Sequence, residues 1–316
     1  MRTYVYTKKD VIVTVCCVVM IVLTAGAVGE SHRDLMFQQR CADNLSSLAK
    51  ALEVYANDYE DALPKAGSRM SNQWVPTLPN WAARRRWDAY GIARDGSSYT
   101  TRVTTTSSLY LLVKYAEAKV EQFVCPGEAD TTALNLRQVP EELPQGFKFI
   151  DAWDFGGRYD AANNPSKHCS YAYHMPFGRY SLTRANDLGM AVMADRNPWM
   201  DPNRVADPNT GWACFDPSAS DPDGTRIGNS EAHQRDGQNV LFVDGRVSFQ
   251  RRPTCGVGND NIYTIASDTT EQGRAKGRRP RVYDPAQPLN RRDSMLVQEV
   301  GFDVPTPAPG TTEEGR

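Results

Sequence analysis

The longest apolar run in the chain covers residues 11–29 and holds 19 residues without a charge. A helix needs about 20 apolar residues to cross the roughly 30 Å of a bilayer's hydrocarbon core, so this run predicts a transmembrane helix. Arg2, Lys8 and Lys9 precede the run, and this basic excess predicts that segment 1–10 stays cytoplasmic. The remainder of the chain is then expected on the other side of the membrane.

The small residues Ala25, Gly26 and Ala27 leave a second interpretation of this run open. Their small-x-small spacing is typical of a signal-peptidase site, in which case the run would be a long signal peptide. The run is longer than the apolar region of about 7–15 residues that signal peptides have. Its length therefore favours a permanent anchor.

The pattern changes after the apolar run, because residues 30–63 predict an amphipathic stalk helix. Leucine and tyrosine recur at steps of three or four, the period that places side chains on one helical face. These residues are Leu45, Leu48, Leu52, Tyr55 and Tyr59. Pro64 follows and ends a helix, so we expect one continuous helix over residues 11–61.

Segment 64–300 predicts a head built of short strands and long polar insertions. Apolar or alternating runs predict a helix at 108–118 and strands at 120–124, 147–150, 169–174, 190–194 and 259–264. Residues 65–107 show no sustained period and predict irregular cover. The proline-rich segment 301–316 predicts a disordered tail. The expected fold class is α+β, with a long N-terminal helix packed on an antiparallel sheet.

The clearest local prediction is a β-hairpin at 239–250. Its two β-rich runs flank Asp244 and Gly245, the pair that a two-residue type I′ turn prefers. Pairing across such a turn sets Phe242 opposite Val247 and Val240 opposite Phe249. All four apolar side chains would then share one face.

Composition narrows the choice of partners and of covalent links. The net charge of -2 and the pI near 6.1 give no drive toward nucleic acid, and Arg84, Arg85 and Arg86 are interpreted as a short solvated run. Four cysteines of the expected head could form two disulfides with three connectivities, or remain buried thiols. They are Cys125, Cys169, Cys214 and Cys255.

No metal, cofactor or catalytic residue is assigned from the sequence. His168, Cys169, His174 and Cys125 have zinc-ligand side chains but lack a Cys-x-x-Cys pair. A calcium loop is not predicted either, because Asp216, Asp221 and Asp223 lack its spacing.

His233 near Asp236 and Asp244 has no nucleophile motif beside it, so an enzyme is not predicted. We expect His233 instead to bond the turn at Asp244. This gives His233 a structural role in the head's sheet.

Five blocks of the chain resemble bacterial type IV pilin-like (pseudopilin-like) proteins. The first runs from Cys-x-x-Asn-Leu at 41–45 to Tyr-x-x-Asp-Tyr at 55–59. The others are Phe-Val-Cys-Pro at 123–126, Ser-Tyr-Ala-Tyr at 170–173, Ala-Asp-Arg-Asn-Pro at 194–198 and a prepilin-type signature at 233–245. The signature residues are His233, Gly237, Asn239, Asp244 and Gly245.

This resemblance implies a non-enzymatic structural or assembly component of a type II secretion or type IV pilus-like envelope system. It implies a single-pass protein of the inner membrane with a periplasmic head, and partners among pilin-like subunits, secretion machinery or further copies of the chain. One feature departs from the family, because Lys8, Lys9, Asp10 and Val11 lack the Gly and Glu of a prepilin-peptidase site. We therefore expect the N-terminus to be retained. The alternative is an exported ligand-binding protein or enzyme on a pilin-like anchor.

Overall fold

A computed structural model describes residues 8–68, 71–93, 100–140, 142–158, 163–219, 222–284 and 286–300. Within these ranges it gives only the backbone of 8–12, 18–19, 21–31, 71, 100, 222 and 223. The predicted tail at 301–316 and the first residues of the predicted cytoplasmic segment lie outside the described residues.

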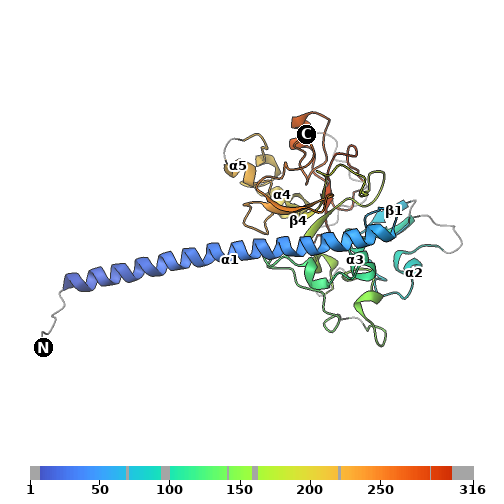
Figure 1. Cartoon of the computed structure of the whole chain (residues 1–316), viewed down its shortest axis with the longest axis horizontal. Helices are drawn as coiled ribbons and strands as arrows, with labels where there is room; N and C mark the ends of the chain where they lie inside the picture. Colours follow the sequence, from blue (N-terminus) through green and yellow to red (C-terminus); the bar gives the residue numbers. More distant parts are fainter. Residues whose placement is uncertain are drawn as a thin grey trace.

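One helix, α1 (Lys8–Asp58), dominates the molecule with its 51 residues. Figure 1 shows its N-terminal half standing clear of the head and its C-terminal half running along it. The predicted continuous helix is thus confirmed, although α1 ends before Pro64, where Glu60 and Asp61 take positive φ angles of 56° and 62°. Among the described residues, no helix is long and apolar enough to cross a membrane. The predicted span at 11–29 falls largely on residues whose side chains lie outside that set.

The predicted apolar stripe of α1 forms its contact with the head. Leu45, Leu48, Leu52 and Tyr55 are buried, as expected from their helical spacing. Tyr59 is 39% exposed, because it lies just beyond the end of the helix, and its ring stacks on Tyr55 with centroids 4.2 Å apart. The stripe prediction is therefore wrong only at its last residue.

A five-stranded antiparallel sheet lies along α1 in the order β6-β5-β4-β3-β7. Its strands are β3 (Tyr171–His174), β4 (Ala191–Asp195), β5 (Gln238–Phe242), β6 (Val247–Gln250) and β7 (Leu296–Val297). Together with α1 it confirms the expected α+β class. Predicted strands 169–174 and 190–194 correspond to β3 and β4.

Both faces of this sheet are covered. The face toward α1 contributes Tyr171, Met193 and Leu241 to a core shared with the helix. The other face contributes Val240 and Phe242 to a second core that contains Trp199 and Phe215. This burial on both sides explains why the central strands are continuous apolar runs without alternation.

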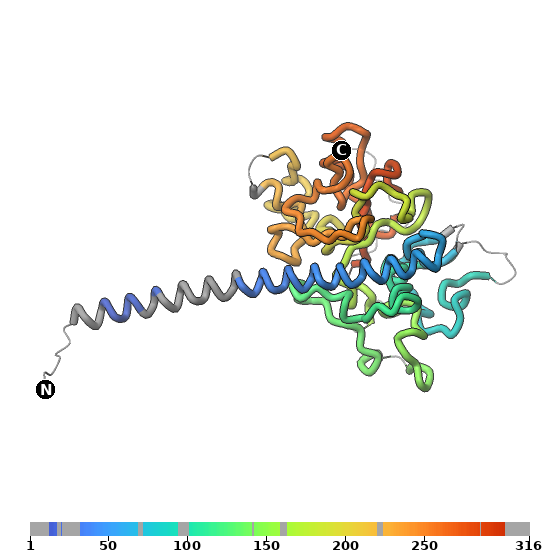
Figure 2. Tube along the Cα trace, in the orientation of Figure 1, coloured from blue at the N-terminus to red at the C-terminus, as the bar shows by residue number. Residues whose placement is uncertain are grey.

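Two further helices, α3 (Thr105–Tyr115) and α2 (Arg86–Tyr90), lie below α1 in Figure 1. A parallel pair of strands, β1 (Ser71–Trp74) and β2 (Thr100–Val103), lies near the C-terminal end of α1, where Figure 1 labels β1. The expected irregularity of 65–107 is wrong at these elements. Their sequences are too short and too polar to show a hydrophobic period. Figure 2 shows the trace of α1 passing between the segment that contains α3 and the sheet.

The remaining described helices are short and belong to the connections. They are η1 (Val120–Phe123), η2 (Phe149–Asp151), η3 (Pro165–His168), η4 (Pro198–Met200), α4 (Pro202–Ala206), η5 (Trp212–Cys214), α5 (Pro222–Arg226) and α6 (Glu271–Ala275). The predicted strands at 120–124 and 147–150 are wrong, because these segments form η1 and η2. Segment 259–264 forms turns, so its strand prediction is wrong too. Short apolar runs do not distinguish such turns from strands.

The hairpin prediction is confirmed in its location and wrong in its register. Leu241 pairs with Val247, and Asn239 pairs with Phe249, one residue away from the predicted alignment. Phe242 N donates to Arg246 O at 3.0 Å, and Gly245 N donates to Phe242 O at 2.9 Å. The loop therefore has three residues, and Gly245 alone takes a left-handed φ of 80°. The shift moves Val247 to the face of Leu241, opposite to the face of Val240 and Phe242.

Candidate functional site

Four side chains with metal-ligand or nucleophilic groups meet in the core where α1 crosses the head. Their ligand atoms all lie within 4.8 Å of one another. Cys41, Cys125 and Asp195 are fully buried and His233 is 8% exposed. We call this group the junction cluster: Cys41, Cys125, Asp195 and His233.

Each member of the junction cluster comes from a different element. Cys41 lies on the buried stripe of α1, one helical turn before Leu45. Cys125 follows η1, and that loop is held to α1 because Asn44 Nδ2 donates to Val124 O at 2.9 Å. Asp195 ends β4, the central strand of the sheet. The cluster therefore joins the helix, the sheet and the connection between them.

His233 is presented by a tight turn before β5. The next residues, Gln234 and Arg235, take left-handed φ angles of 55° and 62°, and Asp236 N donates to His233 O at 3.0 Å. This turn directs the imidazole into the core, where Asn239 Nδ2 lies 3.2 Å from Nε2.

The atoms of the cluster form a connected network. Cys41 Sγ donates to Asp195 Oδ1 at 2.8 Å, and His233 Nε2 lies 3.3 Å from Asp195 Oδ2 and 3.7 Å from Cys125 Sγ. Asn239 N donates to Asp195 Oδ2 at 2.7 Å, and Tyr263 OH donates to Asp195 O at 2.7 Å. These two bonds fix both the carboxylate and the backbone of Asp195.

The protonation of the cluster follows from these contacts. Burial opposes a charged imidazolium, but hydrogen bonds to Asp195 and Cys125 outweigh it and raise the pKa of His233 to about 10. Hydrogen bonding to Cys41 and to His233 lowers the pKa of Cys125 against the effect of burial. Burial raises the pKa of Cys41 well above its ordinary value. The network thus holds an imidazolium beside two thiols of different acidity.

The structure separates most of the residues that the sequence suggested for chemistry. All seven cysteines are described and unpaired, so no predicted disulfide among Cys125, Cys169, Cys214 and Cys255 is formed. The zinc-ligand set considered from the sequence is also dispersed, because His168 bonds Thr132 O and His174 bonds Tyr180 O.

Two further expectations end differently. The predicted bond from His233 to the turn is wrong, because the ring lies against Asp195 and Cys125. In the turn itself, Asp244 Oδ1 accepts from Arg246 N at 3.0 Å. Asp216 lies in the described chain and accepts from Ser218, whereas Asp221 and the side chain of Asp223 lie outside the described residues.

Sequence reasoning did not connect the four members of the cluster. A signal was present, however: Cys41, Cys125, Asp195 and His233 each stand in one of the blocks quoted for the pilin-like resemblance. Their separations along the chain are too long for any spacing rule to join them.

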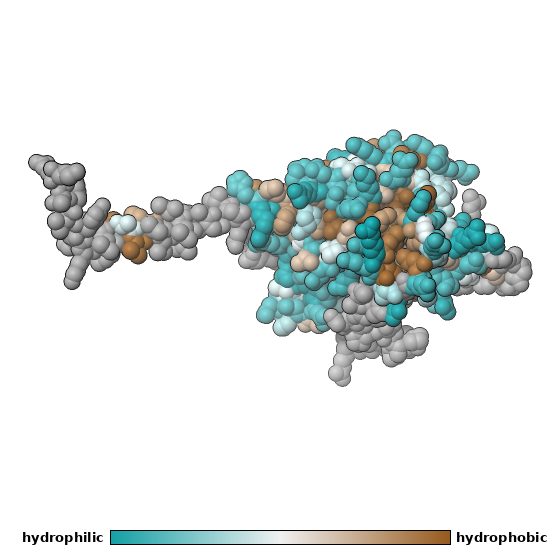
Figure 3. Space-filling view, turned by 90° about the horizontal axis from the view of Figure 1, so that it is seen from below, coloured by the Kyte–Doolittle hydropathy of each residue, from teal (hydrophilic) through white to brown (hydrophobic). Residues whose placement is uncertain are grey.

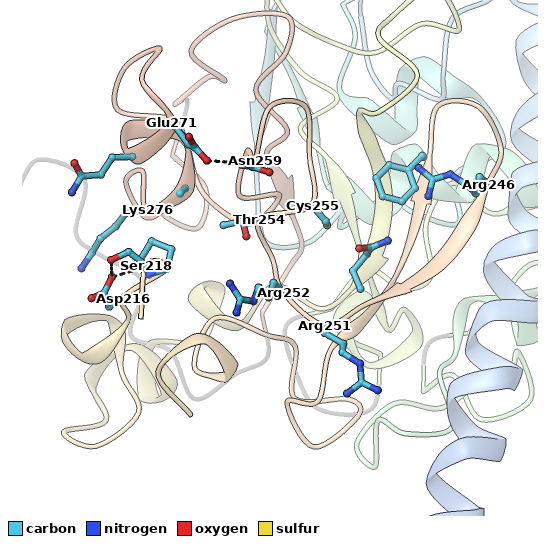
Figure 4. A pocket seen from close by; sticks show the side chains of 15 residues that line it. Asp216, Ser218, Arg246, Arg251, Arg252, Thr254, Cys255, Asn259, Glu271 and Lys276 are labelled. Carbon is cyan, nitrogen blue, oxygen red and sulfur yellow. Dashed lines mark hydrogen bonds between the residues drawn. The ribbon is translucent and has the colours of Figure 1, made fainter. Parts of the chain in front are cut away.

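A second feature is a surface cavity of about 890 Å³ between the β5–β6 hairpin and α6. Figure 4 shows Arg246, Arg251 and Arg252 on one side of it and Lys276, Asp216 and Glu271 on the other. Arg251 and Arg252 are exposed, and Lys276 Nζ donates to Phe215 O at 2.7 Å. The cavity has charges of both signs, and within it the exposed Ser218 Oγ donates to Asp216 Oδ1 at 2.7 Å.

No protein-family model, curated protein sequence or solved structure matches this chain. The geometry of the chain itself therefore carries the functional argument.

Proposed function

We propose that this protein is a membrane-anchored, non-enzymatic structural or assembly component of a pilin-like envelope system. The observation that carries the proposal is the division of α1 into a half that projects from the head and a half that lies in the head's core (Figure 1). Such a helix would anchor the protein through its projecting half and form part of the head's core through the other. The apolar run at 11–29 with its basic N-terminal flank supports insertion in an inner membrane.

The projecting half exposes apolar side chains that favour an apolar environment. Val13 is 61% exposed and Met20 66%, and nearer the head Leu35 and Met36 are 59% and 57% exposed. Lipid or the helices of neighbouring subunits would cover such a surface. Figure 3 shows a further gathering of apolar side chains at the centre of one face of the head, surrounded by polar ones. Both features support lateral assembly.

The alternative of an exported ligand-binding protein or enzyme has one observation in its favour, the charged cavity of Figure 4. Its arginines lie at the surface, whereas small-molecule sites are concave and largely apolar with few, convergent polar groups. The projecting helix has no role in that alternative beyond tethering.

The test uses the full chain in its native envelope. A photo-crosslinking amino acid replaces Leu35 or Met36, with exposed head residue Leu188 as the matched control. We expect the protein in the inner-membrane fraction, and crosslinks from positions 35 and 36 to a second copy or to another single-helix envelope protein. Recovery in the soluble fraction, or membrane recovery without crosslinks from either helix position, would contradict the proposal.

A further inference from the structure

The junction cluster has the composition and spacing of a closed zinc site. Zinc binds cysteine sulfur at about 2.3 Å and histidine nitrogen or carboxylate oxygen at about 2.0–2.2 Å, which separates tetrahedral ligand atoms by about 3.3–3.8 Å. His233 Nε2 lies 3.7 Å from Cys125 Sγ and 3.3 Å from Asp195 Oδ2. These two edges already have the length that a shared ion requires.

We propose that Cys41, Cys125, Asp195 and His233 together bind one Zn²⁺ ion that fastens α1 to the head. A third edge is shorter, because Cys41 Sγ still carries its proton and donates it to Asp195 Oδ1 at 2.8 Å. Zinc binding replaces the thiol protons of Cys41 and Cys125, and the Nε2 proton of His233, with bonds to the metal. The protons pass to solvent, and no oxidant or reductant takes part.

Burial and charge favour an ion at this point. Two thiolates and a carboxylate would place three negative charges in the core, and a divalent cation compensates most of them. A backbone N–H and a side-chain hydroxyl already lie beside the ligands. Asn239 N donates to Asp195 Oδ2 at 2.7 Å, and the hydroxyl of Tyr171 lies 3.4 Å from Cys41 Sγ. Such hydrogen bonds orient ligands in metal sites.

The site is structural in kind. Four protein ligands complete a tetrahedral shell and leave no position for substrate, and the ligands are almost inaccessible to solvent. They come from α1, the loop after η1, the end of β4 and the turn before β5, so one ion would connect segments far apart in the chain. This structural role agrees with the proposed non-enzymatic function, but the zinc site does not depend on that function.

The competing arrangement is a disulfide between Cys41 and Cys125, which an oxidising compartment would allow. A disulfide removes the thiol proton that Cys41 donates to Asp195. It uses two of the four converging groups, whereas a metal ion uses all four. The experiment below separates the two arrangements.

The full chain is purified without chelator, its metal content is measured by mass spectrometry, and its thiols are alkylated before and after chelation. We expect about one zinc per chain, protection of Cys41 and Cys125 until the metal is removed, and a tetrahedral thiolate spectrum after exchange with Co²⁺. Cys125→Ser and Asp195→Asn should lose the metal. Cys169→Ala is the matched control, because Cys169 is equally buried but bonds Tyr171 O outside the cluster.

Two results would overturn the proposal. One is a metal-free protein in which both thiols react without chelation, and the other is a metal-free protein that yields a Cys41–Cys125 disulfide-linked peptide. The cobalt spectrum of the unaltered chain keeps the test decisive even where a variant does not fold.

Discussion

The Gly245 loop shows how one backbone angle sets local stability. Its φ of 80° lies in the left-handed region, and no atom lies within 4 Å of the position that a Cβ would take. Any penalty on substitution is therefore conformational and not a clash. We expect Gly245→Val to lower the free energy of unfolding by about 1–3 kcal/mol.

The matched control is Gly245→Asn, because asparagine tolerates the left-handed region better than a β-branched residue. Chemical denaturation of both variants checks the prediction. Equal stability losses for Val and Asn would show that the backbone angle is not the cause.

His174 is a buried neutral histidine between β3 and β7. Met295 N donates to its Nδ1 at 3.3 Å, so the ring carries its proton on Nε2 and donates to Tyr180 O at 3.2 Å. Burial lowers the pKa of His174 from 6.5 to about 4. Between these two pH values the unfolded chain binds a proton that the folded chain does not, so folding stability falls as the pH falls.

The loss of folding stability attributable to His174 should reach on the order of 3 kcal/mol by pH 4, since each unit of pKa shift corresponds to about 1.4 kcal/mol. Denaturation of the parent and of His174→Gln between pH 7 and about pH 4 measures it. The parent should lose more stability than the variant over this interval. Parallel pH profiles would rule out His174 as the source.

At the scale of elements, Glu299 connects the C-terminal segment to the start of α3. Its carboxylate accepts from the backbone N–H groups of Thr105 and Thr106, the first two residues of the helix, and from Trp74 Nε1 at 2.9 Å. A carboxylate at this position satisfies free N–H groups and complements the helix dipole. Glu299 is completely buried, so removing its carboxylate would leave these three N–H donors with neither a protein acceptor nor water to bond.

Glu299→Ala should therefore destabilise the protein by about 3 kcal/mol or more, and Glu299→Gln by less, because the amide keeps one acceptor. Glu121→Ala, which truncates an exposed glutamate on η1, is the control and should have little effect. Urea denaturation compares the three. A loss no larger than that of Glu121→Ala would remove Glu299 from this role.

The elements also show what sequence patterns can and cannot predict. The period of Leu45, Leu48 and Leu52 identified the buried face of α1, since a helix places these residues together whatever they contact. The hairpin was located by Asp244 and Gly245, but that pair suits two loop lengths, and the register differs between them. β1 and β2 were missed because their polar residues carry no period.

The junction cluster could not be predicted from local sequence patterns for a different reason. Its four residues come from four elements spread between α1 and the turn before β5, and only the packing of α1 against the sheet brings them together. The order of the strands and the register of α1 on them are long-range properties. Local spacing cannot encode them.

At the scale of the whole molecule, α1 is both an appendage and a part of the core. Its C-terminal half contacts β5 and β6 on one side and α3 and η1 on the other. In its N-terminal half, Val13, Val15 and Met20 are more than half exposed. The head should therefore tolerate removal of the projecting half and not of the buried half.

Two shortened chains test this division. A chain beginning at His32 keeps every residue of α1 that is buried among its described side chains, whereas a chain beginning at Asp61 loses Leu45, Leu48 and Leu52 among others. Burying a leucine contributes about 1.5–3 kcal/mol, so these three together contribute about 5–9 kcal/mol, which is comparable with the roughly 5–15 kcal/mol net stability of a folded protein.

We expect the first chain to unfold cooperatively and to show a native near-ultraviolet circular dichroism spectrum. The second should show neither, because the face of the sheet that contains Tyr171 and Leu241 would lose its cover. If the chain beginning at Asp61 unfolds cooperatively, the helix is only a tether, and the head alone forms the core.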